Sequence, residues 1–303
     1  MTFADTPTLT RPTSVAEIRA RLQRFRTDAS REAALAFRPR PHDVFIATYA
    51  KSGTTWMQQI VHCLRTGGDM GFAEVTEVVP WIEGAVDLGL DITAPQRAAP
   101  RAFKTHLTWN EVPKGARYIW MVRNPADVAV SFFHFFEGWF FESGSISLDE
   151  FTSEFFLGGS LSGSYWGHLC GWWQVRDRHS VLALSFEDIK AEPKAAIERV
   201  GRFIGVALSQ PLVDLTAYYS SIEYMRAHAD RFDDRLVRAA RDSACGLPPG
   251  GAASKVRAGN SGDGDALSAD VTAALDARWR EVVLPATGFE NYGALRAALA
   301  YVP

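Results

Sequence analysis

The chain has 303 residues, of which 47% are hydrophobic and 22% are charged, and its formal net charge is -3. This composition is typical of a globular protein with a sizeable core, and it gives no general attraction for nucleic acid or an anionic membrane surface. We therefore expect a local basic site whose partner is a small anion and not nucleic acid.

The three cysteines, Cys63, Cys170 and Cys245, are far apart and match no CxxC spacing. Their pattern argues against a disulfide framework and against a zinc site, and it favours a reducing compartment. The amino terminus has no apolar core of signal-peptide length, and no segment offers about eighteen uninterrupted apolar residues. The sequence therefore predicts a cytoplasmic protein without a membrane span.

The first predicted element is a helix near the amino terminus. Residues Met1–Thr13 show no periodic pattern and are expected to form a loose tail. Ser14 is suited to cap a helix that runs to about Phe25, because the apolar residues of this stretch then share one face. Pro39 and Pro41 stop any helix ahead of the first strand.

Four β-rich apolar runs alternate with helical patterns along the rest of the chain. This alternation predicts an α/β fold, a single domain over residues 1–303 with a central, mostly parallel sheet flanked by helices. An irregular stretch, Glu77–Pro100, is expected to form a wall of the site. The predicted strands are Val44–Ile46, Arg101–Thr105, Arg117–Val122 and Val181–Ser185, and the predicted helices after the first loop are Asn124–Phe141, Leu148–Phe156, Tyr165–Arg178 and Pro193–Gly205.

The stretch Val44–Trp56, VFIATYAKSGTTW, joins the first strand to a helix through a loop of small residues around Lys51. A helix amino terminus has free N–H groups and a positive dipole end, and Thr54 or Thr55 is placed to cap it. Phosphate or sulfate binds well at such a place. A Walker A loop has its lysine after a glycine, so the order here disfavours an ordinary ATPase. A plain polar turn is the alternative.

The second predicted strand ends in FKTHLTW, which places Lys104 and His106 on one face by alternation. Strands of an open α/β sheet present such side chains to a ligand crevice. A histidine that is neutral near pH 7 can accept a proton from an alcohol or a phenol. A histidine buried in the core is the alternative.

The third predicted strand continues into RNPADVAVS, with Arg123 at the end of the strand and Ser131 on the following helix. A guanidinium group and a hydroxyl group together suit a phosphate, because the arginine supplies planar donors and the serine a short adjustable one. A salt bridge at the end of a strand would explain Arg123 equally well.

The motifs KSGTTW, KTHL, RNPADVAVS and RAGNSGDG occur in the order typical of one family, and the chain resembles the cytosolic-type sulfotransferases from about Pro39 to Gly264. These enzymes use 3′-phosphoadenosine 5′-phosphosulfate (PAPS) as donor and release adenosine 3′,5′-bisphosphate (PAP). The resemblance implies a P-loop-like phosphosulfate-binding loop, a histidine base and a 3′-phosphate site. It assigns donor contacts to Lys51, Ser52, Gly53, Thr54, Thr55, Trp56, Arg123, Ser131, Phe186, Ser220, Arg257 and Gly259.

Several residues depart from the family pattern. Ala258 stands in place of a lysine, and Gly264 and Asp265 stand in place of tryptophan and lysine. Phe186 occupies the position of an adenine-contacting tyrosine, and the resemblance places Trp56 on the opposite face of the adenine. Since Asp265 falls where the family's dimerisation pattern would begin, that dimer is not carried over and the oligomeric state is left open.

Aromatic residues between the motifs suggest an apolar pocket for a small-molecule acceptor beside His106. For any one of them alone, a place in the core is the better interpretation. His134, His168 and Cys170 are interpreted as structural residues. The candidate pocket residues are Trp81, Phe132, Phe135, Trp139, Phe140 and Trp166.

The predicted reaction is an in-line transfer of a sulfuryl group from PAPS to an acceptor hydroxyl, with no metal required and no covalent intermediate. His106 takes the proton. Lys51 stabilises the charge that grows on the bridging oxygen, and Lys104 and the amides of Ser52–Thr55 support the transferring group. The acceptor is expected to be lipophilic or aromatic, with an amine as an open alternative.

Two other functions compete with this prediction. A P-loop-type small-molecule kinase would need ATP, Mg²⁺ and carboxylates at a strand end, and no acid closes the predicted strands. A catalytically silent nucleotide-binding protein would keep Arg123 and Ser131 but would have lost the base, and His106 argues against it.

The segment Leu247–Gly264 is rich in Gly, Pro, Ser and Ala and carries Arg257. Such a composition buries little apolar surface, so the segment is predicted to be a mobile lid that becomes ordered when the donor binds. A permanently disordered surface loop is the alternative.

Overall fold

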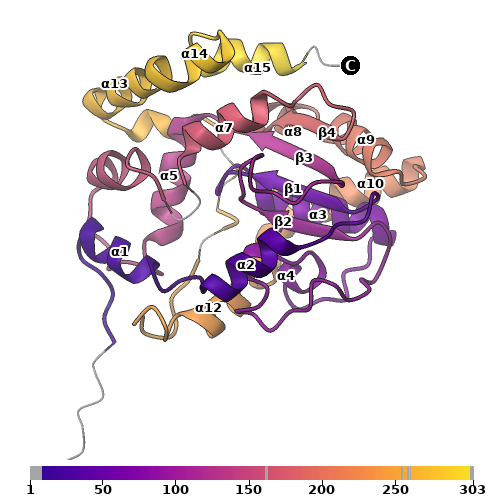
Figure 1. The fold of residues 1–303 in the computed structure, drawn as a ribbon, viewed down its shortest axis with the longest axis horizontal. Helices are drawn as coiled ribbons and strands as arrows, with labels where there is room; N and C mark the ends of the chain where they lie inside the picture. The colour runs from indigo at the N-terminus through magenta and orange to yellow at the C-terminus, as the bar shows by residue number, and fades with distance from the viewer. Residues whose placement is uncertain (1–8, 161–162, 254, 258, 260, 301–303) are drawn as a thin grey trace, which may run out of the picture.

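The computed structural model describes residues 9–160, 163–253, 255–257, 259 and 261–300. Its centre is a four-stranded parallel sheet in the order β2-β1-β3-β4 (Figure 1), which confirms the predicted α/β class. The strands are β1 (Val44–Thr48), β2 (Ala102–Thr105), β3 (Arg117–Val122) and β4 (Val181–Ser185).

The strand order brings the functional motifs together. β1 lies between β2 and β3, so the chain leaves β1, pairs β2 on one side and then crosses to pair β3 on the other side. Because all four strands are parallel, their carboxyl ends meet at one edge of the sheet. The crevice at such a switch point is where open α/β sheets bind ligands.

Both faces of the sheet are covered by helices. On one face Val44 and Ile46 pack in a cluster with α3 (Thr54–Thr66) and α9 (Pro193–Ile204). On the other face Phe45 and Ala47 join a cluster that includes residues of α5, α7 and α13. The period of two along a buried strand thus fills two separate clusters.

The remaining elements surround this core. Figure 1 shows α13, α14 and α15 (yellow) along one border of the molecule next to α7. Besides α3 and α9, the α-helices are α1 (Val15–Leu22), α2 (Asp28–Ala36), α4 (Val75–Val78), α5 (Pro125–Phe136), α6 (Leu148–Glu150), α7 (Tyr165–Trp173), α8 (Phe186–Ala191), α10 (Gln210–Tyr219), α11 (Ile222–Ala227), α12 (Arg235–Arg241), α13 (Ala269–Arg278), α14 (Leu284–Thr287) and α15 (Tyr292–Ala300). Short 3₁₀ and π segments are η1 (Ile82–Gly84), η2 (Phe151–Phe156), η3 (Ala229–Phe232), η4 (Asp263–Ala266) and η5 (Trp279–Val283).

Several predicted boundaries were wrong for local reasons. α5 ends at Phe136 and not at Phe141, because Glu137 is extended and Gly138 has a φ of 78°. The helix predicted for Leu148–Phe156 is a single α-turn followed by the π segment η2. The helix predicted for Tyr165–Arg178 ends at Trp173.

The amino-terminal region also differs from the prediction. Ser14 caps α1 as expected, since its hydroxyl accepts the Glu17 N–H at 3.3 Å. α2 was missed, and Thr27 caps it by accepting the Ser30 N–H. The predicted tail is not loose throughout, because the Pro12 carbonyl accepts the Glu142 N–H at 2.8 Å. Residues 1–8 of that tail lie outside the described residues.

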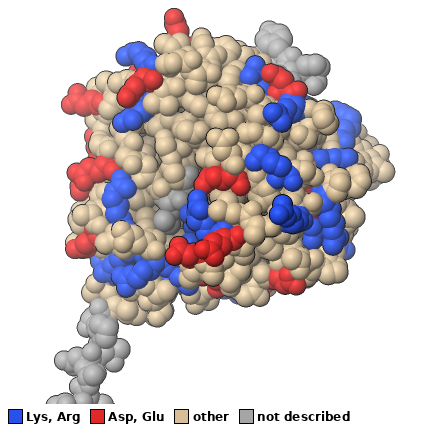
Figure 2. All heavy atoms as spheres, viewed as in Figure 1, with Lys and Arg blue, Asp and Glu red and all other residues tan. Residues whose placement is uncertain are grey.

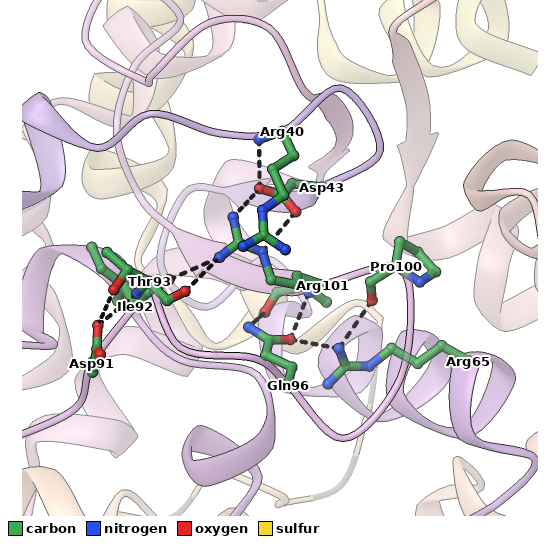
Figure 3. A network of polar contacts seen from close by, with 10 residues as sticks. Arg40, Asp43, Arg65, Asp91, Ile92, Thr93, Gln96, Pro100 and Arg101 are labelled. Atoms are coloured by element: carbon green, nitrogen blue, oxygen red, sulfur yellow. Dashed lines mark hydrogen bonds and ion pairs between the residues drawn. The ribbon is translucent and has the colours of Figure 1, made fainter.

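The irregular stretch before β2 is held in place by a buried ion pair. Arg101 donates from Nε and Nη2 to the two carboxylate oxygens of Asp43 at 2.9 and 2.5 Å, and Arg101 Nη1 reaches the Thr93 carbonyl (Figure 3). Arg65 of α3 donates to the side chain of Gln96. These contacts lie at the amino ends of the strands, and they position the wall that carries Trp81 and Glu83 at the opposite end.

Acidic and basic side chains are interspersed over the face shown in Figure 2, without a large patch of either sign. This distribution agrees with the small net charge. In the part of the chain that the structure describes, no helix combines the length and the apolar character needed to cross a bilayer.

Candidate functional site

A cavity of about 500 Å³ lies at the carboxyl edge of the sheet. Its lining joins residues from the ends of all four strands, for example Lys51, His106, Arg123 and Phe186. Of the predicted site residues, Ser52 and Trp166 do not line it. The structure places all the others around this cavity: Lys51, Gly53, Thr54, Thr55, Trp56, Trp81, Lys104, His106, Arg123, Ser131, Phe132, Phe135, Trp139, Phe140, Phe186, Ser220, Arg257 and Gly259.

The loop after β1 has an unusual backbone. Lys51 has a φ of 70° and Gly53 a φ of 93°. A Cβ at Gly53 would lie 2.8 Å from Met121 Cε and 2.9 Å from Phe186 Cδ2, so both the conformation and the space require glycine there. Backbone strain of this kind is common at ligand-binding loops.

The start of α3 differs in detail from the prediction. Gly53 is the N-cap, and Thr54 and Thr55 already belong to the helix, so neither caps it. The first intrahelical bond runs from the Met57 N–H to the Gly53 carbonyl, which leaves the N–H groups of the first turn available to an anion. The Ser52 N–H is not available in the same way, because it donates to the Tyr49 carbonyl at 3.2 Å.

His106 is held with one ring nitrogen committed to the backbone. Its Nδ1 lies 2.8 Å from the Thr48 carbonyl, which can only accept, so Nδ1 carries the hydrogen and Nε2 is left as the basic nitrogen. The backbone N–H of His106 donates to Glu83 at 2.7 Å. Burial, followed by the charge of Lys104, lowers the pKa of His106 well below 6.5. The imidazole is therefore neutral at pH 7 and able to accept a proton.

Two lysines approach the same space from β1 and β2. Lys51 Nζ lies 4.0 Å from the centre of the Phe135 ring, and Lys104 Nζ lies 5.0 Å from that of Trp81. Burial, followed by the charge of Lys255, lowers the pKa of Lys104 to about 8 and lowers the pKa of Lys51 well below 10.5. A buried anion between them would restore the charged form of both.

The predicted 3′-phosphate residues meet at the end of β3. Arg123 donates to the Lys51 carbonyl at 3.1 Å, and its guanidinium carbon lies 4.4 Å from the centre of the Phe186 ring. Burial lowers the pKa of Arg123 from 12.5. Arg257 pairs with Asp263 at 2.5 Å and keeps 36% of its side chain exposed, so a carboxylate already serves as its partner.

The segment around Gly262 is attached to α5 by Asp127. Both carboxylate oxygens accept the Gly262 N–H, at 3.1 and 3.0 Å, and one of them accepts the Gly264 N–H at 2.8 Å. A Cβ at Gly264 would lie 2.5 Å from the Cβ of Ala126. The close approach to α5 thus explains a glycine where the family pattern has tryptophan. Ala258, another departure from that pattern, lies outside the described residues.

The predicted adenine site is only partly as expected. The rings of Trp56 and Phe186 make an edge contact, with centroids 5.4 Å apart and planes at 68°, so no base can lie between them as the sequence suggested. Trp56 is left with a stacking face towards the cavity. Ser220 donates its hydroxyl to the Thr216 carbonyl at 2.7 Å and keeps its lone pairs as acceptors.

The part of the cavity that is predicted to hold the acceptor is aromatic. Phe132, Phe135 and Phe140 line it, and Trp139 is fixed there because its indole N–H donates to Asp242 at 2.8 Å. The prediction for Trp166 was wrong. This side chain is 1% exposed and lies edge-on to Trp279 in the cluster that covers one face of the sheet.

Sequence reasoning missed several charged residues near this cavity, and four of them make ion pairs or hydrogen bonds there. Asp234 and Lys255 form a buried ion pair in its wall, Asp263 holds Arg257, and Glu83 holds the backbone of His106. Asp263 belongs to the RAGNSGDG motif and Lys255 lies two residues ahead of it, so the motif could have pointed to both. Asp234 and Glu83 carry no such signal. Among the described residues, no group of three or more His, Cys, Asp or Glu is placed to hold a metal ion.

Comparison with known proteins gives matches over much of the chain. A family model for the sulfotransferase domain matches residues 41–241. Sulfotransferase 1B1 of Canis lupus familiaris is 34% identical over 202 residues, which are 63% of this chain and 68% of that protein. Sulfotransferase 1C2 of Rattus norvegicus is 32% identical over 201 residues, which are again 63% of this chain and 68% of that protein.

Solved structures share the fold. The crystal structure of mouse sulfotransferase SULT7A1 complexed with PAP has a TM-score of 0.67 and 20% identity, and the match covers 92% of this chain and 95% of that one. A retinol dehydratase in complex with androsterone and PAP has the same TM-score and 21% identity. This match covers 88% of this chain and 85% of the retinol dehydratase chain.

Proposed function

The chain belongs to the sulfotransferase domain family and is a PAPS-dependent sulfotransferase, and from this premise we propose that it sulfates a hydroxyl group of a small lipophilic acceptor with His106 as the base. The observation that carries the proposal is the geometry of His106. Its Nδ1 is committed to the Thr48 carbonyl and its Nε2 is unprotonated, in a cavity that also holds Lys51 and Lys104.

The proposed mechanism uses the charges around this cavity. The N–H groups of the first turn of α3 and Lys51 bind the phosphosulfate, and Arg123, Ser131 and Arg257 bind the 3′-phosphate. Lys51 and Lys104 stabilise the negative charge that moves towards the leaving bisphosphate, and their buried setting strengthens this effect. His106 Nε2 takes the acceptor proton as the new bond forms.

The aromatic half of the cavity supports a lipophilic acceptor, since it offers ring faces and few polar partners away from His106. A neutral His106 suits a phenol or an alcohol, because either must lose its proton during transfer. An amine would meet the same base.

Calorimetry with PAP and with ATP plus Mg²⁺ tests the donor, and transfer from ³⁵S-labelled PAPS tests the reaction. We expect PAP to bind at least about tenfold more tightly than ATP, because Arg123 and Arg257 each contribute a charge-assisted contact. Label should pass to 4-nitrophenol or a long-chain alcohol in preference to glucose. Tighter binding of ATP would favour a kinase, and PAP binding without transfer to any alcohol, phenol or amine would favour a silent nucleotide-binding protein.

We also propose that residues 247–264 close over the bound donor. The expectation that they bury little apolar surface was wrong for part of the segment, since Leu247 and Ala253 are buried beside α1 and Trp139. Closure therefore concerns the part around Arg257, whose side chain is 36% exposed.

Limited proteolysis should report this closure. Trypsin can cut after Lys255 and Arg257, and PAP is expected to slow these cuts several-fold because it supplies the counter-charge for Arg257, whereas adenosine 5′-monophosphate (AMP) is not. Cleavage after Arg202, which is exposed and does not line the cavity, serves as the internal control. Equal rates with and without PAP would contradict closure.

A further inference from the structure

We propose that Lys255 is a third lysine of the sulfuryl-transfer site and that Asp234 is the residue that holds it there. Lys255 and Asp234 line the same cavity as Lys51, Lys104 and His106. Their side chains form an ion pair and are only 8% and 6% exposed. The inference rests on the proposed function, and it adds a group that the motifs do not contain.

The backbone of Asp234 has an uncommon and costly conformation, which suggests that its side chain has a function. It occupies the N-cap position of α12 with a φ of 50° and a ψ of 32°, and its side chain makes no capping hydrogen bond. An aspartate at an N-cap ordinarily stabilises the helix by about 0.5–2 kcal/mol. Here the carboxylate turns away from the helix and is buried against Lys255, so both the cap and the solvation of a charge are given up.

Lys255 brings a further positive charge to the cavity that Lys51, Lys104 and His106 line. Its charge is the first among the charges that lower the pKa of Lys51 and of Lys104, and it also lowers that of His106. Asp234 acts in the opposite direction on both lysines. Lys255 and Asp234 therefore both act on the charges of Lys51 and Lys104.

Lys255 has a carboxylate partner, whereas none of the described carboxylates forms an ion pair with Lys51 or Lys104. Glu83 and Glu74 act on Lys104 without pairing with it, so an anion can still bind between the two lysines. The sulfuryl group of PAPS supplies that anion. Asp234 thus keeps Lys255 in place before the donor arrives, without filling the site.

Lys255 neither gives nor takes a proton in the transfer step. The bond from sulfur to the bridging oxygen breaks and its electron pair leaves with PAP, while a bond from sulfur to the acceptor oxygen forms. The acceptor proton passes to His106 Nε2. Lys255 lowers the energy of the negative charge on the sulfuryl oxygens.

The first test compares PAPS with PAP by calorimetry, which needs no acceptor. Lys255→Met should weaken PAPS binding at least about tenfold, the loss expected for one charge-assisted contact, and PAP binding less than about threefold. Lys194→Met is the matched control, because Lys194 also pairs with an aspartate, Asp214, but is 60% exposed and does not line the cavity. Equal loss for PAPS and PAP would mean that Lys255 only anchors the segment, and no loss for either ligand would also overturn the proposal. Failure of the parent protein to bind PAP would instead contradict the proposed function.

The second test uses Asp234→Asn, which keeps the shape of the side chain and removes its charge. Lys104 is faced by Lys255, Asp234, Glu83 and Glu74. In the parent, PAPS affinity should fall as the pH rises through about 8, where Lys104 loses its proton. In the variant the fall should begin about one pH unit lower, because an attractive charge near the lysines is lost. An unchanged pH profile would overturn the role of Asp234, and it does so even if Lys255→Met fails to fold.

Discussion

Replacing His106 with asparagine is expected to lower turnover by about 10²–10⁴-fold, the usual range for loss of a general base. PAP binding should stay within about threefold of the parent, because asparagine keeps the side chain neutral. Asparagine still offers an N–H to the Thr48 carbonyl, so the contact that positions Nδ1 is kept and only the base at Nε2 is lost. Single-turnover transfer from labelled PAPS at saturating acceptor measures the effect on the chemical step.

His168→Asn is the matched control for His106→Asn. His168 is another buried histidine. It lies on α7, its ring contacts that of Tyr49, and it does not line the cavity. Its replacement should leave turnover within about tenfold of the parent, since it has no contact with substrate. Residual activity of the same size in both variants would show that the proton goes to Lys104 or to water.

Arg123→Ala is expected to weaken PAP binding at least about tenfold, since a charge-assisted contact to a phosphate contributes about 1.5–3 kcal/mol. The guanidinium group is 6% exposed and is already oriented by the Lys51 carbonyl and the Phe186 ring, so little ordering opposes binding. Arg257→Ala should cost less, because Arg257 is more exposed and must share its charge with Asp263. Calorimetric titration with PAP gives both values.

AMP provides the control for the arginine variants, because it lacks the 3′-phosphate. Its affinity should change less than about threefold in Arg123→Ala if the loop after β1 stays intact. Loss of PAP and AMP binding together would mean that Arg123 acts by supporting the Lys51 carbonyl and does not contact the 3′-phosphate.

Much of the sheet could be predicted from the sequence because the strands are buried on both faces. Arg117–Val122 and Val181–Ser185 were predicted with their observed bounds, since continuous apolar runs between turn signals indicate such strands. The order β2-β1-β3-β4 could not be read in this way, because pairing partners lie tens of residues apart. Periodicity reports the environment of one element and does not identify its neighbour.

The residues of the cavity could likewise be predicted only in part. Residues in motifs, such as Lys51 and Arg123, meet where expected, because each stands at the end of a predicted strand. Trp166 was misplaced, since an aromatic residue on a helix packs equally well against a core as against a ligand. Asp234 was missed because its partner, Lys255, is 21 positions further along the chain.

The hydrogen bonds from Gly262 and Gly264 to Asp127 have a consequence for the entropy of donor binding. They fix one end of the segment that carries Arg257 to the helix that also carries Ser131. Each residue whose backbone is already ordered spares the binding step about 1–2 kcal/mol of conformational entropy. We therefore expect Asp127, which does not line the cavity, to contribute to donor affinity, because it fixes one end of the segment from which Arg257 is proposed to reach the 3′-phosphate.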